Sequence, residues 1–263
     1  MVHSYFSNEP MVLAHRGASA YAPEHTLDAL RLAIEQGADA IEADVHLTRD
    51  GHAVLHHSGD LSENTDGEGP LKQYTLDEIR NFDAGYSWSS DGGETFPYRG
   101  KGHRVTTLAE ALDTFPKTRF NLDIKERRAA QATRRLVDEH RASDRVLLAA
   151  WYSWQRAPAL RNYPGPRSIT LDQMLAFILL HWTRLDGFWG ASMDALQLPE
   201  THWGLRLVTP RLVERAHELG MRVHVWTVDS EADMDRLLDW GVDGIITKKP
   251  DLAVRARTRH LCE

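Results

Sequence analysis

A unit of helix, glycine and strand recurs along this chain and limits the folds that are open to it. Near the amino end, Thr26 can cap a helix that ends at Gly37 and leads into an apolar strand over residues 40–45. Toward the carboxyl end the unit occurs twice more, with its glycines at Gly220 and Gly241. Strands that alternate with helices pair in parallel, because each helix crosses back over the sheet. The pattern therefore predicts an α/β fold.

Nine segments read as strands, one more than a (β/α)8 barrel contains. They are residues 11–14, 40–45, 53–57, 119–125, 145–150, 167–171, 195–199, 222–228 and 243–247. The extra strand is explained by a hairpin signal at Arg49-Asp50-Gly51, which would fold the third segment back and set His57 beside Asp44. The 263 residues are close to the roughly 250 of a TIM-type barrel. We expect one such barrel domain over residues 1–263.

Residues 58–104 interrupt the regular pattern. They are rich in Gly, Ser, Asp and Glu and contain one helix signal, a capping box from Thr75 to Glu78. A second capping box, from Thr107 to Glu110, restarts the alternation. A loop-rich stretch of this length inside a compact domain is usually functional. The segment is interpreted as a small cap inserted over the barrel mouth.

Composition and charge narrow the class of partner. The net charge of -7 argues against nucleic acid or an anionic membrane as the main partner. The only cysteine, Cys262, excludes an internal disulfide and a thiolate metal cluster, and favours a reducing compartment. Residues 1–10 carry no apolar run, and the apolar stretch 174–180 is far shorter than the roughly 20 residues of a membrane span. We expect a cytoplasmic protein that acts on a small molecule.

Polar side chains follow the first strand and lie within the second. His15 and Arg16 come directly after the first strand, whereas Glu42 and Asp44 lie two residues apart in the second and so point to one face. Active sites of barrels gather at the carboxyl ends of the strands. Two carboxylates on an apolar strand are costly to bury unless a cation lies between them. A hard divalent cation with oxygen ligands suits this arrangement.

The fourth strand segment repeats the two-residue spacing. There Asp123 and Lys125 add a third carboxylate and a cation. Taken singly, these groups also have structural explanations: Glu42 and Asp44 could form salt bridges between strands, and Lys125 could simply neutralise Asp123.

Histidines need the same comparison, because the chain has 14 of them. Alone, His57 is more typical of a surface or hairpin residue, and His46, His52 and His56 are interpreted in that way. Their order along the chain favours a functional over a structural explanation. A histidine and an arginine follow the first strand, paired carboxylates lie on the second, a histidine follows the hairpin, and a carboxylate and a lysine come next. This order favours a functional site.

The same order resembles the glycerophosphodiester phosphodiesterase family, over about residues 12–251. The matching motifs are Ala14-His-Arg-Gly17, Pro23-Glu-His-Thr26, Gly37-Ala-Asp-Ala-Ile-Glu-Ala-Asp44, Leu47-Thr-Arg-Asp-Gly51, Asn121-Leu-Asp-Ile-Lys125, Val225-Trp-Thr-Val-Asp229 and Gly241-Val-Asp-Gly-Ile-Ile-Thr247. The resemblance implies a metal-dependent hydrolase that converts deacylated phospholipids to glycerol 3-phosphate and an alcohol.

The resemblance also implies a role for particular residues. It makes His15 and His57 the catalytic acid and base, in an order that the sequence does not decide. It implies one divalent cation, Mg²⁺ or Ca²⁺ with Mn²⁺ also possible, held by Glu42, Asp44 and Asp123. Phosphate and substrate would be bound by Arg16, Lys125 and Trp226, although Trp226 could equally serve ordinary barrel packing.

Four positions depart from the family pattern. The family usually has Asn at His25, Asp at Ser58, Glu at Asp123, and Asp at Lys248. The change at position 58 removes a carboxylate that could support the site. Both histidines and all three carboxylates remain, so we expect an active enzyme.

Three other functions are compatible with parts of the pattern. A lysophospholipase D or sphingomyelinase D type enzyme would need an apolar groove, which Phe177, Trp182, Phe188 and Trp189 could line, although core or dimer contacts suit them better. A weakened barrel could bind phosphodiesters without turnover, as the substitutions at 58 and 123 hint. A bimetallic hydrolase fits least, because its usual paired-histidine strand motif is missing.

Overall fold

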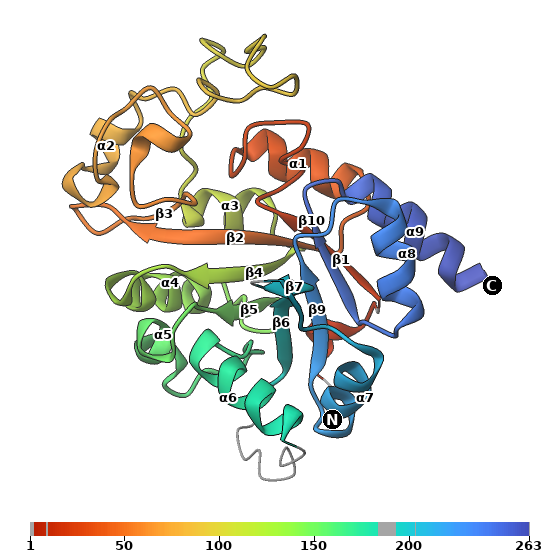
Figure 1. Cartoon of the computed structure of the whole chain (residues 1–263). Helices are drawn as coiled ribbons and strands as arrows, with labels where there is room; N and C mark the ends of the chain where they lie inside the picture. Colours follow the sequence, from red (N-terminus) through yellow and green to blue (C-terminus); the bar gives the residue numbers. More distant parts are fainter. Residues whose placement is uncertain (1–2, 9, 184–192, 203, 263) are drawn as a thin grey trace.

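The computed structural model describes residues 3–8, 10–183, 193–202 and 204–262 of the chain. Its strands lie in the middle of the molecule, with helices around them (Figure 1). The strands are β1 (Met11–His15), β2 (Ala40–Leu47), β3 (Ala53–Leu55), β4 (Arg119–Ile124), β5 (Val146–Ala149), β6 (Ala195–Pro199), β7 (Thr201–His202), β8 (Leu205–Arg206), β9 (Arg222–Trp226) and β10 (Gly244–Thr247). The α-helices are α1 (Leu27–Glu35), α2 (Leu76–Ile79), α3 (Leu108–Thr114), α4 (Arg127–Glu139), α5 (Ser153–Leu160), α6 (Leu171–Trp182), α7 (Pro210–Glu218), α8 (Glu231–Asp239) and α9 (Pro250–Cys262).

The parallel sheet curls into the predicted barrel. Its strands follow the order β5-β4-β2-β1-β10-β9-β6, and the eighth position belongs to residues 167–169. These residues bridge Leu148 of β5 on one side and Ala195 of β6 on the other. The predicted strand over residues 167–171 is thus shorter than expected, because α6 begins at Leu171. The TIM-type fold is confirmed.

The hairpin prediction also holds. Strand β3 pairs with β2 in antiparallel register, and its other side meets residues 106 and 107, so it lies outside the ring. The backbone N–H of His56 donates to the carbonyl of Asp44 at 3.1 Å, which places the residues after β3 beside the middle of β2. The small β7–β8 hairpin was not expected from the sequence.

Local signals explain where the helices begin and end. Thr26 accepts a hydrogen bond from the N–H of Ala29, and Thr107 forms a complete capping box with Glu110. The predicted box of Thr75 and Glu78 opens the short helix α2. Glycines 37, 220 and 241 have φ of 90°, 79° and 82°, the left-handed conformation that ends a helix. None of the helices in the described ranges combines the length and apolar character that a bilayer crossing requires.

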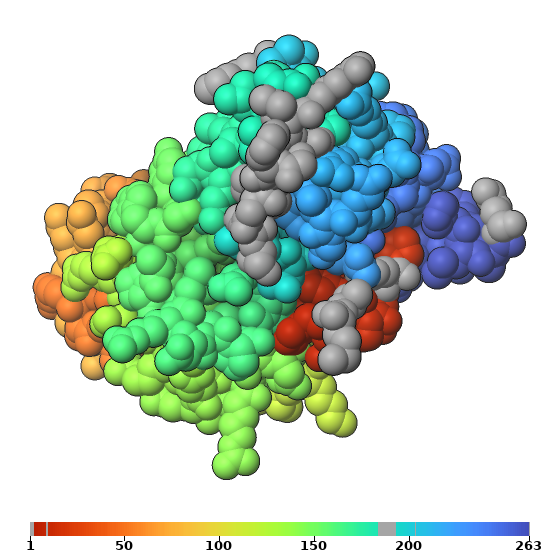
Figure 2. All heavy atoms as spheres, turned by 90° about the horizontal axis from the view of Figure 1, so that it is seen from below, coloured from red at the N-terminus to blue at the C-terminus, as the bar shows by residue number. Residues whose placement is uncertain are grey.

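The amino end of the barrel is closed by the chain's own N-terminal segment. The 3-10 helix Ser4–Phe6 buries Tyr5 completely and Phe6 almost completely. Both belong to one buried cluster with Leu13, Ala40, Leu147, Ala149, Ala195 and Ile246 from five barrel strands. From below, the N-terminal segment (red) lies between the green and the blue parts of the chain (Figure 2). The inside of the barrel is therefore packed at this end.

Residues 58–104 form a lobe at the far end of β2 and β3 (Figure 1). The lobe has a small core of its own, which joins it to the strand hairpin: Val54, Leu61, Leu71, Leu76, Ile79, Ala84 and Val105. Its loops approach the barrel near β1. There the indole of Trp88 donates to the backbone carbonyl of Ser19 at 3.0 Å. The hydroxyl of Tyr98 donates to the backbone carbonyl of Tyr21, also at 3.0 Å.

Acid should destabilise the fold through His224, which is fully buried in β9. Burial lowers the pKa of His224 to about 4, whereas an unfolded histidine titrates near 6.5. Between these values the unfolded chain binds the extra proton, so stability is present above pH 6.5 and is lost as pH falls toward 4. One such group removes about 2 kcal/mol between pH 7 and pH 5. Urea unfolding of His224→Gln should show a shallower pH dependence than the wild type, and exposed His52→Gln an unchanged one.

Candidate active site

The carboxyl ends of β1, β2 and β4 bring six predicted residues together. The strand register pairs His15 with Glu42 and Asp44 with Asp123, because β2 lies between the other two strands. Arg16 and Lys125 follow directly on β1 and β4. All six side chains line one cleft in the mouth of the barrel, and so does His57.

Asp44 is the most connected of these groups. Its carboxylate accepts from the ammonium of Lys125 at 2.7 Å and lies 3.2 Å from Nε of Arg16, while only 3% of its side chain is exposed. Lys125 also contacts Asp123 at 2.6 Å, so one ammonium bridges two carboxylates. Burial lowers the pKa of Lys125, but the charges of Asp123 and Asp44 outweigh this and raise it. The lysine therefore remains a cation inside the site.

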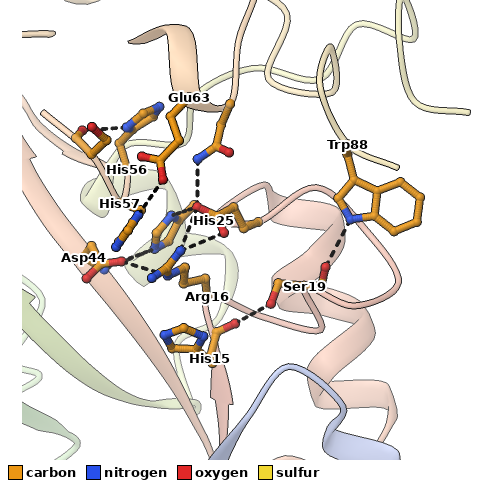
Figure 3. Close-up of polar contacts among 12 residues, drawn as sticks. His15, Arg16, Ser19, His25, Asp44, His56, His57, Glu63 and Trp88 are labelled. Atoms are coloured by element: carbon orange, nitrogen blue, oxygen red, sulfur yellow. Dashed lines mark hydrogen bonds and ion pairs between the residues drawn. The ribbon is translucent and has the colours of Figure 1, made fainter. Parts of the chain in front are cut away.

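Both the backbone conformation of Arg16 and its ion pairs orient its side chain. Its φ is 60°, and the guanidinium forms a second ion pair with Glu24 at 2.9 Å. His25 has the same left-handed conformation, with φ of 61°, and its Nε2 accepts the backbone N–H of Asp44 at 3.1 Å. Histidine tolerates this backbone region better than most residues, which explains how it can stand where the family usually has Asn. Figure 3 shows Arg16 and His25 converging on Asp44.

Gly17 makes this turn possible. Its φ is 85°, and an added Cβ would lie 2.7 Å from the backbone carbonyl of Ala29. The first turn of α1 thus packs directly on the backbone at Gly17, which leaves no room for a side chain there.

Burial sets the charge of the inner groups. It raises the pKa of Glu42 well above its usual range, and the nearby charge of Asp44 raises it further. His15 lies 3.9 Å from Glu42, and burial lowers its pKa to about 2, with further lowering by Arg16 and Lys248. Lys248 directly follows β10, beside the end of β1, and its side chain is exposed. His15 is accordingly neutral in this arrangement.

His57 lies in a different environment, at the edge of the cleft. Its side chain is 37% exposed, and its Nδ1 lies 2.9 Å from Oε1 of Glu63 (Figure 3). No local pattern could have predicted Glu63, because the contact depends on how the lobe folds back onto the hairpin. Glu24 was missed for a similar reason, since it reaches the site through Arg16.

The opposite side of the cleft is mostly apolar, although Ser168, Gln197 and His202 also line it. It is lined by Ala149, Ala150, Trp151, Ile169, Leu171, Met174, Pro199, Trp226 and Ile246. The rings of Trp151 and Trp226 lie 6.2 Å apart between centroids and are tilted by 57°. The predicted position of Trp226 at the pocket is consistent with these contacts, and Trp151 is an additional aromatic side chain there. The cleft encloses about 200 Å³, and none of its described lining residues comes from 58–104.

Two predictions about other side chains need correction. His56 was interpreted as a surface or hairpin residue, but it is 3% exposed and its Nδ1 lies 2.7 Å from the carbonyl of Ser58. The turn after β3 points it inward, under the lobe. His52 is exposed as expected, with 55% of its side chain accessible. His46 is the second residue to correct: its side chain is largely buried, and its Nδ1 lies 3.6 Å from Oε1 of Glu126.

Of the four side chains suggested for a lipid groove, the two that the structure describes differ in exposure. Phe177 is completely buried in the core beside β6 and β9, whereas Trp182 is 56% exposed at the end of α6. Phe188 and Trp189 lie outside the described residues.

A cation site needs oxygen ligands that hydrogen bonds do not already occupy. One buried oxygen each of Glu42, Asp44 and Asp123 accepts no hydrogen bond, although that of Asp44 lies 3.2 Å from Nε of Arg16. Carboxylate oxygens are the ligands that Mg²⁺ and Ca²⁺ prefer. Within the described ranges, no three His, Cys, Asp or Glu side chains are arranged to hold a metal ion, and Lys125 provides the positive charge between Asp44 and Asp123. The three carboxylates are thus the kind of ligand that a hard cation takes, but in this arrangement Lys125 occupies the position between two of them.

Comparisons with known proteins agree with this geometry. The model of the Glycerophosphoryl diester phosphodiesterase family matches residues 15–252. A glycerophosphodiester phosphodiesterase from Caldanaerobacter subterraneus subsp. tengcongensis is 33% identical over 257 residues, which cover 93% of this chain and 96% of that protein.

Solved structures share the fold. The glycerophosphoryl diester phosphodiesterase domain of an uncharacterized Mycobacterium tuberculosis protein has a TM-score of 0.83 at 22% identity, covering 96% of this chain and 100% of that one. An Oleispira antarctica phosphodiesterase, solved in complex with the product sn-glycerol-3-phosphate, has a TM-score of 0.78 at 26% identity, covering 97% and 99%.

The family match makes this chain a phosphoric diester hydrolase, and the carboxylates, cations and histidines at the ends of its strands are the groups that such an enzyme needs. The family match and the curated relative make the assignment specific. The chain belongs to the glycerophosphoryl diester phosphodiesterase family, and the predicted enzyme class is confirmed.

Replacing Gly17 should disturb both the fold and the site. Gly51 has a similar φ of 89°, but no atom lies within 4 Å of its added Cβ. Gly51→Ala should therefore cost only the roughly 1–2 kcal/mol of a left-handed residue. Gly17→Ala should cost more, because the clash with Ala29 adds to this, and turnover should fall as His15 and Arg16 shift. Denaturant unfolding and diesterase assays of the two variants measure the difference; equal losses would contradict the close packing at Gly17.

Proposed function

We propose that this enzyme hydrolyses glycerophosphodiesters to glycerol 3-phosphate and an alcohol by acid–base catalysis with His15 and His57. One observation carries the proposal: both histidines line the single cleft that also holds two cations and three carboxylates. A phosphodiester is anionic, and its alkoxide leaving group needs a proton. Such a reaction therefore requires charge stabilisation, a base and an acid at one phosphorus atom. The glycerol 3-phosphate bound to the Oleispira antarctica relative supports this product class.

Arg16 and Lys125 are proposed to bind the phosphoryl oxygens. Arg16 is oriented by Glu24 and Asp44, and Lys125 by Asp44 and Asp123, so both cations are fixed before a ligand arrives. Fixed donors of this kind lower a barrier without reorganising during the reaction. Trp226 and Trp151 provide an apolar wall on the other side of the cleft, against which the carbon atoms of the substrate can pack.

A divalent cation is proposed to be held by Glu42, Asp44 and Asp123. When bound, it would stabilise negative charge on the phosphoryl oxygens. Its binding would also offset the cost of keeping three carboxylates in a largely buried site, because an adjacent cation favours their charged form.

The size of the cleft favours a deacylated substrate over a lysolipid. Its volume of about 200 Å³ lies below the roughly 300–1,000 Å³ of sites that enclose drug-sized ligands. An acyl chain would need a continuing apolar groove, and Phe177 is buried in the core rather than exposed to one.

Removing divalent cations should abolish turnover. After chelation we expect no release of glycerol 3-phosphate from glycerophosphocholine in a coupled assay, and recovery on addition of Mg²⁺, Ca²⁺ or Mn²⁺. Asp123→Glu should retain or raise activity, since it lengthens the third ligand by one methylene. Full activity in excess chelator would refute the cation site.

Replacing either catalytic histidine should reduce turnover strongly. His15→Ala and His57→Ala should each cost roughly 10²–10⁴ in kcat, the usual contribution of a positioned acid or base. His52→Ala is the matched control, because His52 is exposed on the same hairpin and lies outside the cleft lining. His56→Ala is unsuitable as a control, since that side chain is buried.

An activated substrate separates the two roles. A p-nitrophenyl diester has a leaving group that needs little protonation, so the variant without the acid should recover on it and the variant without the base should not. Near-normal activity of both alanine variants on a natural diester would contradict the two-histidine mechanism.

A further inference from the structure

His57 receives its hydrogen-bond partner from the inserted lobe and not from the barrel. The carboxylate of Glu63 lies 2.9 Å from Nδ1 of His57, and the other ring nitrogen points away from Glu63 (Figure 3). Position 58, where a neighbouring acid was expected, carries Ser58, whose hydroxyl accepts the backbone N–H of Asp60 instead. The acid missing at position 58 thus has a counterpart five residues further along the chain.

We propose that Glu63 is a positioning residue for His57. A carboxylate can only accept a hydrogen bond, so the contact selects the tautomer that carries its hydrogen on Nδ1. Nε2 then keeps its lone pair and can exchange a proton with a ligand in the cleft. The carboxylate also stabilises the imidazolium that forms when His57 takes up a proton. The inference rests on the proposed function for the role of His57.

The backbone around Glu63 is well held. Glu63 ends the 3-10 helix Leu61–Glu63, which Asp60 caps by accepting from the N–H of Ser62 at 3.0 Å. Leu61 is fully buried, and its N–H donates to the carbonyl of Gly69 at 3.0 Å. Because these contacts fix the helix, the carboxylate approaches His57 from a defined direction.

The next residue repeats the connection. The amide of Asn64 donates to Glu24 at 2.7 Å, and Glu24 is the carboxylate that pairs with Arg16. Of two consecutive residues of the lobe, one therefore contacts a site residue and the next contacts the partner of another site residue. This pattern is expected if the lobe orients the site, and a loop that only covers the surface would not need it.

The charge of Glu63 suits the role. Burial raises its pKa, but the hydrogen bond and charge of His57, the hydroxyl of Ser58 and the charge of His56 together outweigh this effect, and the pKa is lowered overall. Glu63 is therefore an ionised acceptor at neutral pH. Its side chain is 41% exposed, so solvent weakens the interaction relative to a fully buried pair.

The first test observes the tautomer of His57 without using activity. Protein labelled with ¹⁵N-histidine is examined by NMR, and the ring signals of His57 are assigned by their loss in His57→Ala. In the wild type we expect hydrogen on Nδ1 and an unprotonated Nε2. In Glu63→Ala the signals should shift toward the Nε2–H form. Unchanged signals in that variant would overturn the proposal.

The second test uses kinetics with a matched control. Glu63→Ala should lower kcat by about 10-fold, well below the roughly 10⁴-fold loss for a buried triad aspartate, because Glu63 is partly exposed. KM should change less than about twofold, since Glu63 does not line the cleft. Glu68→Ala removes another exposed carboxylate of the lobe and should be silent, whereas Glu63→Asp should recover part of the loss. An equal effect of the two alanine variants would reject the assignment.

The two tests separate this inference from the proposed function. If the wild type turned over no glycerophosphodiester, the proposed function would fail, and the NMR comparison would still decide whether Glu63 orients His57.

Discussion

The arrangement of the site depends on the burial of one carboxylate, Asp44. A buried charge is tolerated only when opposite charges and hydrogen bonds surround it. Here Lys125 lies 2.7 Å from the carboxylate, Arg16 lies 3.2 Å from it, and the backbone N–H of Asp44 is bound by His25. These three partners come from β4, from the turn after β1 and from the loop before α1. Satisfying Asp44 therefore fixes the relative positions of the segments that form the charged half of the cleft.

Much of this could be predicted, because the information is local and periodic. Alternate residues of a strand share a face, so Glu42 with Asp44 and Asp123 with Lys125 had to point the same way. The capping threonines and the glycines after helices marked the crossovers, which in turn imply parallel neighbours. In a barrel, parallel strands bring their carboxyl ends to one rim. The hairpin at Gly51 followed from its turn chemistry, and its register placed the residues after β3 beside Asp44.

The remaining features depend on contacts between distant segments, for which the sequence has no periodic signal. Glu63 reaches His57 only because the lobe packs its own core, and the inward direction of His56 depends on the same packing. The strand predicted at 167–171 pairs through only a few residues, because α6 starts immediately after it. Trp151 follows β5 and Trp226 ends β9, with residues 167–169 and β6 between these two strands. Their contact is set by the closure of the ring. Propensity and spacing carry no information on such pairings.

The N-terminal segment limits the routes by which small molecules can enter and leave the cleft. Tyr5 and Phe6 fill the amino end of the barrel, and the cleft opens at the opposite end. Among the described residues the cleft is therefore closed toward the amino end of the barrel, so that it forms a pit and not a tunnel. Whatever binds there must diffuse out by the route through which it arrived. Under the proposed function, the product bound at Arg16 and Lys125 would leave such a pit after the product nearer the opening. Accumulated inner product would then compete directly with fresh ligand for the same opening.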